Sequence, residues 1–413
     1  MTKRALLFSA AGAFFFAACG GSVPDTTPQP TDDAGADVID TDAEVDAGPA
    51  KYPADHTPLP QVDYHGGRVL DTMKIVTVTF ANDDQTLVGR LNDFGDTITN
   101  TPWWSETTSE YCAQPKNTPC IGPGSGGGHT SIADAPAASY TDSSGGGAST
   151  IQDFIKAHVI DKTLPDPTMN TLYAIYFPKN VSINLDGSES CNSFGAYHNT
   201  VTLHNAKNEL VVSAYAIMPR CGGEQTTTTS ASHEFVEAAT DPDVGLNLLS
   251  YYMTSSLWAV AGGEVGDLCV DFAGANDKLV ELGYTVQRSW SNKSASMSHD
   301  PCVPIPAGSV YFNAAPRKDR IILKNAGDTA TVDFDAFSDA PTADWTVSAL
   351  DFAQFQGGQS SMSFAVDKKT VNNGTHITVT VTATKTPPPQ GGFALLSKQG
   401  SNTHFWPVEV RRN

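Results

Sequence analysis

Hydrophobic residues between about residues 59 and 304 occur in two kinds of run that alternate along the chain. Continuous apolar runs with β-branched or aromatic residues predict buried strands, whereas apolar residues spaced three or four apart predict helices. The predicted strands cover 74–80, 172–177 and 210–217, and the predicted helices cover 87–97, 149–159 and 226–240. We therefore expect an α+β domain over 59–304, in which strands lead into helices that lie against a sheet.

Beyond Cys302 the pattern changes to short runs that alternate between apolar and polar residues. Pro304, Pro306 and Gly308 form a predicted hinge, and no cysteine follows it. The predicted strands of this part are 310–312, 320–323, 330–334, 345–348 and 376–382. Short strands separated by turn residues predict an all-β, immunoglobulin-like sandwich over 305–413. Its role is open between carbohydrate binding and a structural appendage.

The first 19 residues have the pattern of an export signal. Lys3 and Arg4 precede an apolar run, and small residues lead to Cys19. This order is typical of a secretory signal peptide. The segment 16–19, Phe-Ala-Ala-Cys, also resembles a bacterial lipobox, in which the cysteine becomes the lipidated first residue, and Gly20 is compatible with sorting to an outer membrane.

These features predict an exported protein, an outer-membrane lipoprotein that faces the periplasm or the exterior. If Cys19 is not lipidated, the protein is expected to be secreted. The apolar run of the signal is too short to span a bilayer, so we expect contact with the membrane through the lipid anchor only.

Residues 20–58 combine many acids and prolines with no aromatic residue before Tyr52. Such a segment buries too little apolar surface to offset its ordering entropy, which predicts a disordered acidic tether. The whole chain has 45 Asp and Glu against 25 Lys and Arg, a formal net charge of −20. A charge of this sign and size repels phosphates, so no nucleic acid is expected as a partner.

Apart from Cys19, six cysteines lie between residues 112 and 302. An even number in an exported chain favours disulfides over free thiols, and the absence of a CxxC pair disfavours a cysteine zinc site. Six cysteines permit 15 connectivities. Their order along the sequence favours three pairs: Cys112 with Cys120, Cys191 with Cys221, and Cys269 with Cys302.

The predicted helix 226–240 carries the candidate chemistry. It ends before Pro242, because the residue that precedes a proline is disfavoured in helical conformation. One stripe of the helix is apolar and faces a core, while the opposite stripe carries His233, Glu234 and Glu237 and is expected to face a cleft or solvent. His233 and Glu237 are four residues apart, so both side chains can reach one ion.

This arrangement is a variant of the HExxH helix, in which two histidines hold zinc and the intervening Glu is the general base. Glu237 replaces the second histidine, and a carboxylate oxygen is also a zinc ligand. Glu264 or Asp267, in a glycine-containing segment beside Cys269, would supply the missing ligand. His198 is a candidate for a fourth ligand or for a transition-state donor.

Five segments together resemble the extracellular exordium or phosphate-induced protein family and its secreted bacterial relatives. They are WWS at 103–105, GAYH at 195–198, SHEFVEAATDP at 232–242, GEVGDLC at 263–269 and VQRSWSN at 286–292. The resemblance covers about 200 residues and implies a zincin-like metallopeptidase domain.

Carried over to these positions, the resemblance implies that His233, Glu237 and Glu264 are ligands and that Glu234 is the catalytic base. Asp267 is then an alternative third ligand or a support, and Asp241 fixes the helix end. His198 would stabilise the oxyanion.

We therefore expect an envelope-anchored, zinc-dependent metallopeptidase-like protein that hydrolyses peptide bonds with metal-activated water. The alternative is a non-catalytic, metal-stabilised scaffold or binding protein of the cell envelope. Its partner is expected to be a peptide or protein substrate in the first case and an envelope component in the second. Several carboxylates beside one histidine would also suit Ca²⁺ or Mn²⁺.

Overall fold

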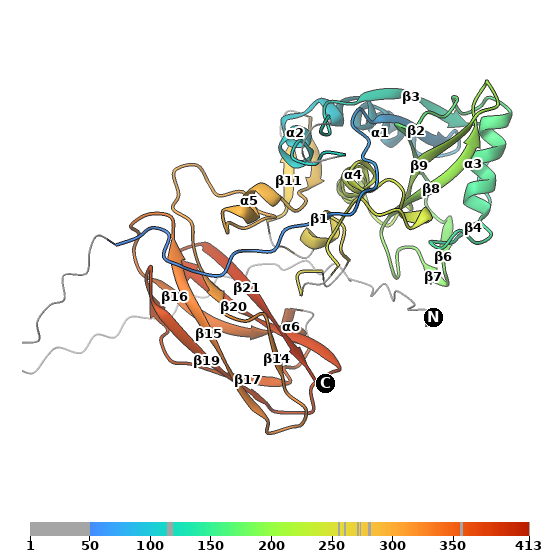
Figure 1. Cartoon of the computed structure of the whole chain (residues 1–413). Coiled ribbons are helices and arrows are strands. Elements are labelled where there is room, and N and C mark those ends of the chain that lie inside the picture. Colours follow the sequence, from blue (N-terminus) through green and yellow to red (C-terminus); the bar gives the residue numbers. More distant parts are fainter. Residues whose placement is uncertain are drawn as a thin grey trace, which may run out of the picture.

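The structure is a computed structural model that describes residues 50–412, except for 114–118, 255–256, 260–261, 271, 273, 280–281 and 356–357. The predicted signal peptide, Cys19 and residues 20–49 of the predicted tether lie outside the described residues. The described chain forms two units, a mixed α/β domain followed by a β-sandwich (Figure 1). In this part of the chain no helix is both long and apolar enough to traverse a bilayer.

A five-stranded mixed sheet is the centre of the α/β domain. In spatial order its strands are β3 (Ser125–Ile132), β2 (Lys74–Phe80), β5 (Thr171–Tyr176), β9 (Leu210–Met218) and β8 (Tyr197–His204). The first four run parallel to one another, and β8 runs antiparallel to β9 at the edge. β8 is therefore an edge strand, and one of its sides has no neighbouring strand in this sheet. It lies beside the helix that follows β9.

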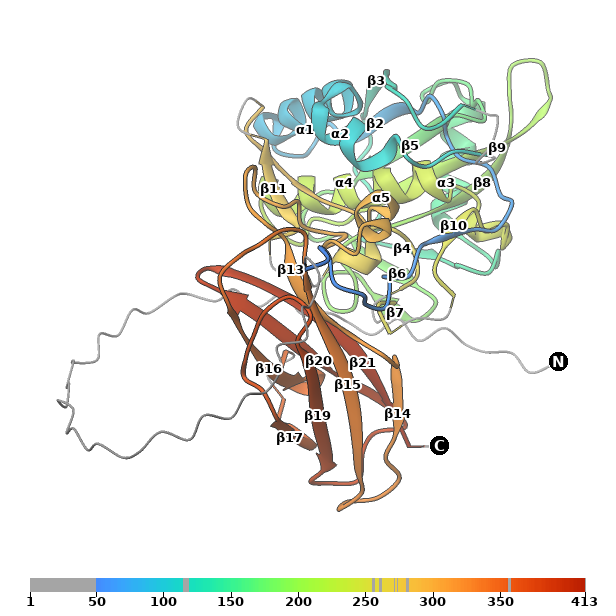
Figure 2. The same cartoon turned by 60° about the vertical axis from the view of Figure 1, so that its left-hand side comes forward.

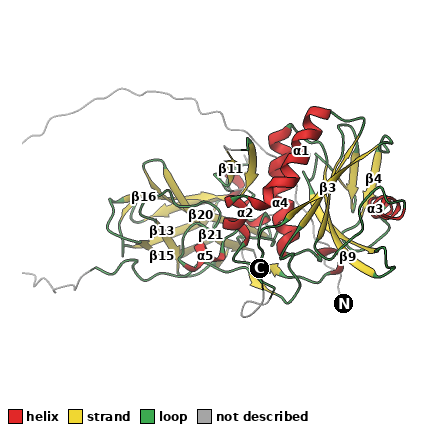
Figure 3. Cartoon of the chain, turned by 90° about the horizontal axis from the view of Figure 1, so that it is seen from above, coloured by secondary structure: helices red, strands yellow, loops and turns green. Residues whose placement is uncertain are grey.

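Helices cover both faces of this sheet, because successive apolar side chains of its strands point to opposite faces and both sets have to be buried. The helices α1 (Gln85–Thr97) and α4 (Glu224–Thr240) lie on one face, and α3 (Thr150–Ile160) lies on the other (Figure 3). On β5, Leu172, Ala174 and Tyr176 belong to the core beneath α4, whereas Tyr173 and Ile175 belong to the core beneath α3. Asp84 and Ser149 cap the starts of α1 and α3 through their side chains.

Shorter elements complete this domain. They are β1 (Asp63–Tyr64), α2 (Pro102–Thr108), β4 (Ser139–Asp142), β6 (Ser182–Leu185), β7 (Ser188–Glu189), β10 (Tyr251–Tyr252), β11 (Asn276–Leu279), β12 (Tyr284–Gln287) and α5 (Asn292–Ser296), with the 3-10 turns Ile98–Asn100, Val244–Leu246 and Asp267–Cys269. β11 and β12 form a hairpin, and β12 packs along α4.

The C-terminal unit is a sandwich of two sheets (Figure 2). One sheet has the order β13 (Phe312–Pro316), β15 (Thr329–Ser338), β19 (His376–Ala383), β17 (Met362–Val366). The other has the order β14 (Arg320–Ile322), β21 (Asn402–Arg411), β20 (Gln390–Gln399), β16 (Trp345–Asp351), β18 (Thr370–Val371), and the short helix α6 (Phe352–Phe355) follows β16.

Without β14 and β18, which are the two shortest strands, these sheets have the A-B-E-D and G-F-C order of an immunoglobulin constant-type domain. Trp345, at the start of the strand in position C, is buried in the core between the sheets. The immunoglobulin-like character predicted for this part is thus present in the fold.

The two units share a core, because Tyr311, Phe337 and Trp406 of the sandwich belong to the same buried cluster as α1 and α4. The end of the predicted tether also packs there. His56 stacks on Phe337 with ring centroids 3.6 Å apart, and the backbone N–H of Ala54 donates to Asn373 Oδ1. Ala54 and His56, which lie in the predicted tether, therefore pack on the sandwich.

The predicted central strands and helices all occur, with bounds that differ by up to about two residues. The domain is better described as mixed α/β than as α+β, because helices and mostly parallel strands alternate along the chain. The glycine-rich strand β3 and the edge strand β8 were not among the predicted elements. All three predicted disulfides are confirmed, namely Cys112–Cys120, Cys191–Cys221 and Cys269–Cys302.

Candidate metal centre

Helix α4 is held firmly at both ends. At its start, Arg90 of α1 pairs with Glu224 at 3.1 Å. At its end, the N–H of Asp241 donates to Glu237 O, and Asp241 Oδ1 accepts a hydrogen bond from Ser250 N at 2.8 Å. Asp241 therefore closes the helix at the position that the sequence predicts.

The polar face of α4 is buried, contrary to the prediction of a face open to a cleft or solvent. Only 12% of the His233 side chain and 3% of the Glu237 side chain are exposed. β8 and the segment 262–269 cover this face, and both pack there from elsewhere in the sequence. The sequence pattern of α4 does not show which distant segments pack on the helix. For this reason the prediction that its polar face is exposed is wrong.

The edge strand β8 brings His198 onto α4. His198 Nδ1 lies 3.2 Å from Glu234 Oε2 and 3.6 Å from Glu237 Oε2, and Nε2 lies 3.3 Å from Glu264 Oε1. Nε2 also lies 3.2 Å from the carbonyl oxygen of Asp241. Both ring nitrogens are thus engaged with oxygen atoms, and this arrangement favours a ligand or positioning role for His198 over that of an oxyanion donor.

The segment 262–269 approaches α4 closely because it contains glycines. A Cβ atom on Gly266 would lie 2.8 Å from Glu237 Oε1 and 2.9 Å from His233 Nδ1. Asp267 N donates to Glu237 Oε1 at 2.9 Å, and Gln287 Nε2 donates to Gly266 O at 2.8 Å. The Cys269–Cys302 disulfide holds the end of the same segment, so a side chain at residue 266 would displace the acids that this segment carries.

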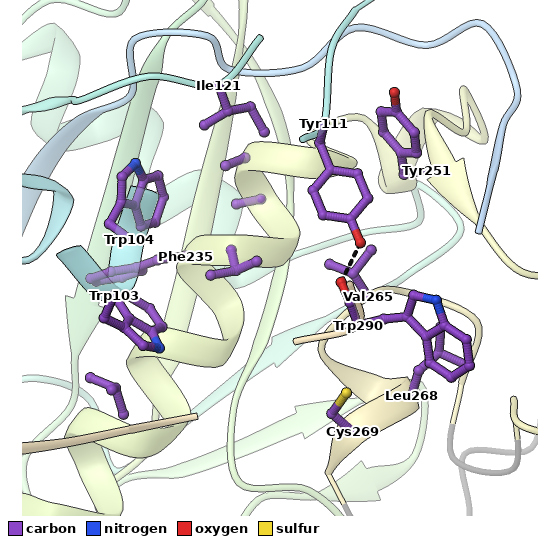
Figure 4. Close-up of a cluster of buried hydrophobic side chains, with 14 of the residues drawn as sticks. Trp103, Trp104, Tyr111, Ile121, Phe235, Tyr251, Val265, Leu268, Cys269 and Trp290 are labelled. Atoms are coloured by element: carbon purple, nitrogen blue, oxygen red, sulfur yellow. Dashed lines mark hydrogen bonds between the residues drawn. The ribbon is translucent and has the colours of Figure 1, made fainter. Parts of the chain in front are cut away.

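The hydrophobic cluster beneath this segment fixes its position (Figure 4). The figure shows the α2 tryptophans Trp103 and Trp104 beside Phe235 of α4, and Val265 and Leu268 beside Trp290. The hydroxyl group of Tyr111 donates to the carbonyl oxygen of Trp290. The apolar side of α4 and the apolar residues of the loop therefore belong to one core, which aligns the two sets of acids.

The potential ligand atoms fall into two groups that share Glu237. One group is His198, Glu237 and Glu264, and the other is His233, Glu237 and Asp267; within each group the atoms lie within 4.8 Å of one another. His233 Nε2 is 3.1 Å from Glu237 Oε2 and 3.6 Å from Asp267 Oδ1. The structure thus brings all six predicted site residues together, and it places Asp267 rather than Glu264 beside the helix pair.

Burial and crowding shift the pKa values of these groups strongly. Burial would lower the pKa values of His198 and His233, but the neighbouring acids, chiefly Glu264 for the first and Glu237 for the second, outweigh it and raise both pKa values well above the usual range. Burial, reinforced by the charge of Glu237, raises the pKa of Asp267 well above its usual range. Burial and the charge of Glu264 raise the pKa of Asp241 to about 8.

If all its acids were ionised, the cluster would carry more negative charge than its own histidines could neutralise. It contains the carboxyl groups of Glu234, Glu237, Asp241, Glu264 and Asp267. Within the described chain, the ion pairs of the glutamates and of Asp267 are with His198 and His233, and no Lys or Arg pairs with any of the five acids. A carboxylate without a counter-charge is costly to bury, so this site suits a bound cation.

An unpartnered atom supports the same fit. Asp241 is fully buried, and its Oδ2 has no hydrogen-bond partner. Imidazole nitrogens combined with carboxylate oxygens are donors for Zn²⁺ and Mn²⁺, whereas Ca²⁺ takes oxygen ligands. The donor set therefore fits a transition-metal ion better than Ca²⁺.

Two features of the site were not among the candidates from the sequence. The carboxylate of Asp241 was expected only to fix the helix end, and Tyr252 was not singled out. The nearby acids Glu264 and Asp267 add to the effect of burial in raising the pKa of Tyr252 to about 12. The pairing of β10 with β1 positions Tyr252, a contact between segments almost 190 residues apart that no local pattern signals.

Comparisons with known proteins found no match by sequence and partial likenesses by structure. The sequence matches no known family model, and no curated protein is detectably similar to it. Solved structures that are similar to part of the chain include the E. coli chaperone DraB (9% identity, TM-score 0.20, 24% of this chain and 53% of that one). Others are domains 4 and 5 of the S-layer protein SbsC (14%, 0.19, 25% and 47%) and a chimeric titin Z1Z2 (14%, 0.17, 25% and 95%).

The chain spans about half the length of the first two of these structures. TM-scores of this size carry no argument about function. The immunoglobulin-like description given above rests on the strand order of the sandwich itself.

Proposed function

We propose that this protein is an exported, zinc-dependent hydrolase of peptide bonds whose α/β domain is zincin-like. The observation that carries the proposal is the largely buried group His233–Glu237–Asp267 on and beside α4, with Glu234 next to it and, among the described residues, no Lys or Arg paired with it. A purely structural site would have no need of Glu234, since His233, Glu237 and Asp267 already provide a ligand set.

Each residue of the site would have its own role in hydrolysis. His233, Glu237 and Asp267 would hold the zinc ion, which when bound would polarise a carbonyl group and acidify water. Glu234 would take a proton from the attacking water and return it to the amide nitrogen that leaves. His198, 3.2 Å from Glu234 Oε2, would keep this carboxylate in place.

The exposure of the side chains indicates the side from which a substrate would approach. Asp267 and Glu264 have 22% and 16% of their side chains exposed, against 6% for Glu234 and 2% for His198. A peptide would therefore reach the cluster from the side of the segment 262–269. The three disulfides suit an oxidising, exported location, which agrees with the predicted lipoprotein.

The alternative is a metal-stabilised envelope scaffold without catalysis. The specific observation in its favour is the low exposure of the cluster, because structural metal sites are closed whereas catalytic sites keep an open position. The partner would then be an envelope component rather than a peptide substrate.

One experiment separates the two functions. The metal content of the purified full chain is measured by inductively coupled plasma mass spectrometry, together with hydrolysis of casein, for the wild type, His233→Ala, Glu234→Gln and Glu224→Gln. We expect bound zinc in the wild type, loss of the zinc ion that His233 holds in His233→Ala, and zinc retained in Glu234→Gln with a rate about 10²–10⁴-fold lower.

Glu224→Gln is the matched control, because it makes the same change at the other end of α4, where Glu224 pairs with Arg90. It should leave both zinc content and rate unchanged. Zinc binding without hydrolysis in the wild type would reject the enzyme and support the scaffold.

A further inference from the structure

The position of Glu237 Oε2 between two imidazoles raises the question of how many ions the cluster holds. This oxygen lies 3.1 Å from His233 Nε2 and 3.6 Å from His198 Nδ1. The other oxygen, Oε1, is already used, since it accepts the hydrogen bond from Asp267 N. Glu237 Oε2 is therefore shared between the two halves of the cluster.

The two histidines do not converge on one point. Each belongs to its own group of mutually close ligand atoms, His198 with Glu264 and His233 with Asp267, and Glu237 is common to both groups. A single ion would have to bring His198 and His233 into one group. The arrangement has instead one set of donors on each side of Glu237.

The inner half, around His198, needs a positive charge of its own. His198 Nδ1 can donate to Glu234 Oε2, which lies 3.2 Å away, and Nε2 then faces Glu264 Oε1 at 3.3 Å and the carbonyl oxygen of Asp241 at 3.2 Å. Neither an ionised carboxylate nor a carbonyl oxygen can donate to Nε2, so either a second proton or a cation must lie between them. Histidines that bind metals commonly donate their other N–H to a carbonyl or carboxylate, as His198 can do to Glu234.

An unpartnered acid adjoins the same half. Asp241 Oδ2 is buried without a hydrogen-bond partner, and Glu264 Oε1 is a buried atom outside hydrogen-bond geometry with His198. Protonation of His198 would supply one positive charge. Together with the ion held by His233, it would leave part of the charge unbalanced when all five clustered carboxyl groups are ionised.

We propose that the cluster is a two-metal centre in which Glu237 bridges an outer ion, held with His233 and Asp267, and an inner ion, held with His198 and Glu264. The inference deepens the proposed function, since the outer ion is the one assigned there to catalysis. Two-metal sites occur in hydrolases, where the ions jointly stabilise the attacking and leaving groups. The inner ion is a divalent transition metal, because one of its donors is an imidazole.

The number of ions tests this inference directly. The full chain is stripped with a chelator, dialysed against Zn²⁺ at a fixed free concentration, and analysed for zinc per chain. We expect about two zinc ions in the wild type, about one in His198→Gln and in Asp267→Asn, and a loss of both in Glu237→Gln. Glu224→Gln is the matched control and should retain both ions, and circular dichroism spectra verify that each variant is folded.

Loading with Mn²⁺ allows a second measurement, in which the magnetic coupling between bound ions is observed in the wild type itself. Electron paramagnetic resonance of the wild type with two equivalents of Mn²⁺ should show a spin-coupled pair, and Asp267→Asn should show only isolated ions. One ion per chain in the wild type, with uncoupled Mn²⁺, would overturn the inference and leave His198 as a protonated positioning residue.

The result also separates this inference from the proposed function. One ion with hydrolysis would reject only the two-metal centre, and two ions without hydrolysis would reject only the enzyme. A wild type that binds no metal would reject both.

Discussion

In the β-sandwich, Glu409 of β21 is buried, with 6% of its side chain exposed, and two arginines neutralise it. Arg320 pairs with one of its carboxylate oxygens, and Arg411 donates to the other at 2.7 Å. Glu237 of α4 is just as buried, with 3% exposed, yet its charged partners in the described chain are two histidines that are themselves surrounded by acids.

The difference shows which charges the fold balances by itself. Burial would raise the pKa of Glu409, but Arg320 and Arg411 hold it below the usual range. At the cluster, burial and mutual repulsion raise the pKa values of Asp241, Glu264 and Asp267. Glu409 is therefore balanced by side chains of its own fold, whereas the charge of the α4 cluster would be completed by the proposed metal ion.

Removal of metal should give the largest effect, because it acts on one of these regions and not on the other. A ligand that binds only the folded state stabilises it by about 2.7–4.1 kcal/mol at free concentrations of 100–1,000 Kd. Urea unfolding of the full chain with disulfides intact should therefore show a free energy of unfolding lower by about 3–4 kcal/mol in EDTA than in Zn²⁺.

Glu237→Gln should abolish this response to zinc, and Glu409→Gln should retain it in full. An equal stability of the wild type in EDTA and in zinc would show that the cluster is balanced without an ion, as the sandwich is, and the comparison would fail.

A smaller effect is expected where the cluster is disturbed without removal of a ligand. In Gly266→Ala the added methyl group would lie 2.8 Å from Glu237 Oε1 and 2.9 Å from His233 Nδ1, while the backbone angles of Gly266, φ −77° and ψ −44°, suit alanine. The effect is therefore steric, and we expect a metal affinity about 10–100-fold weaker, the size typical of changes beside metal ligands. Competition with a chromogenic chelator measures it.

Gly223→Ala is the matched control, since a Cβ atom there meets no atom within 4 Å at the start of the same helix. Its affinity should equal that of the wild type. If Gly266→Ala bound zinc with unchanged affinity, the close packing of the segment 262–269 on α4 would not matter for the site.

The sequence predicted well those features that depend on neighbours along the chain. The helix α4, its end at Asp241 and the spacing of His233 and Glu237 are local, and so are the continuous runs that predicted β2 and β5. The disulfide pairs followed from order because each pair closes a short stretch of chain, 33 residues at most.

Features that depend on partners distant in the sequence could not be predicted from local patterns. β3 begins Ser-Gly-Gly-Gly and has no strand propensity, yet a Cβ on Gly127 would lie 2.7 Å from Ile75 O, so only glycine permits its close approach to β2. The assignment of Glu264 to His198 and of Asp267 to His233 depends on how the segment 262–269 crosses α4. The spacing of residues along the sequence does not show how that segment crosses α4.

The smallest effect concerns the balanced region and its dependence on pH. The pKa of Glu409 is below its usual value of 4.5 in the folded protein, so the ionised form is favoured by folding. Its contribution to stability is present above pH 4.5 and is lost as the pH falls through the lower, folded-state pKa. Because the arginine partners are about half exposed, the contribution should not exceed about 1 kcal/mol.

Glu409→Gln isolates this contribution, since glutamine keeps the size of the side chain and removes its titration. The free energy of unfolding of the wild type should exceed that of Glu409→Gln at pH 6, and the difference should shrink between pH 4.5 and 3. A difference that stays constant over this range would mean that the arginines contribute through packing and not through charge. The sandwich would then offer no example of a buried acid balanced by its own fold, and the contrast with α4 would rest on the metal measurements alone.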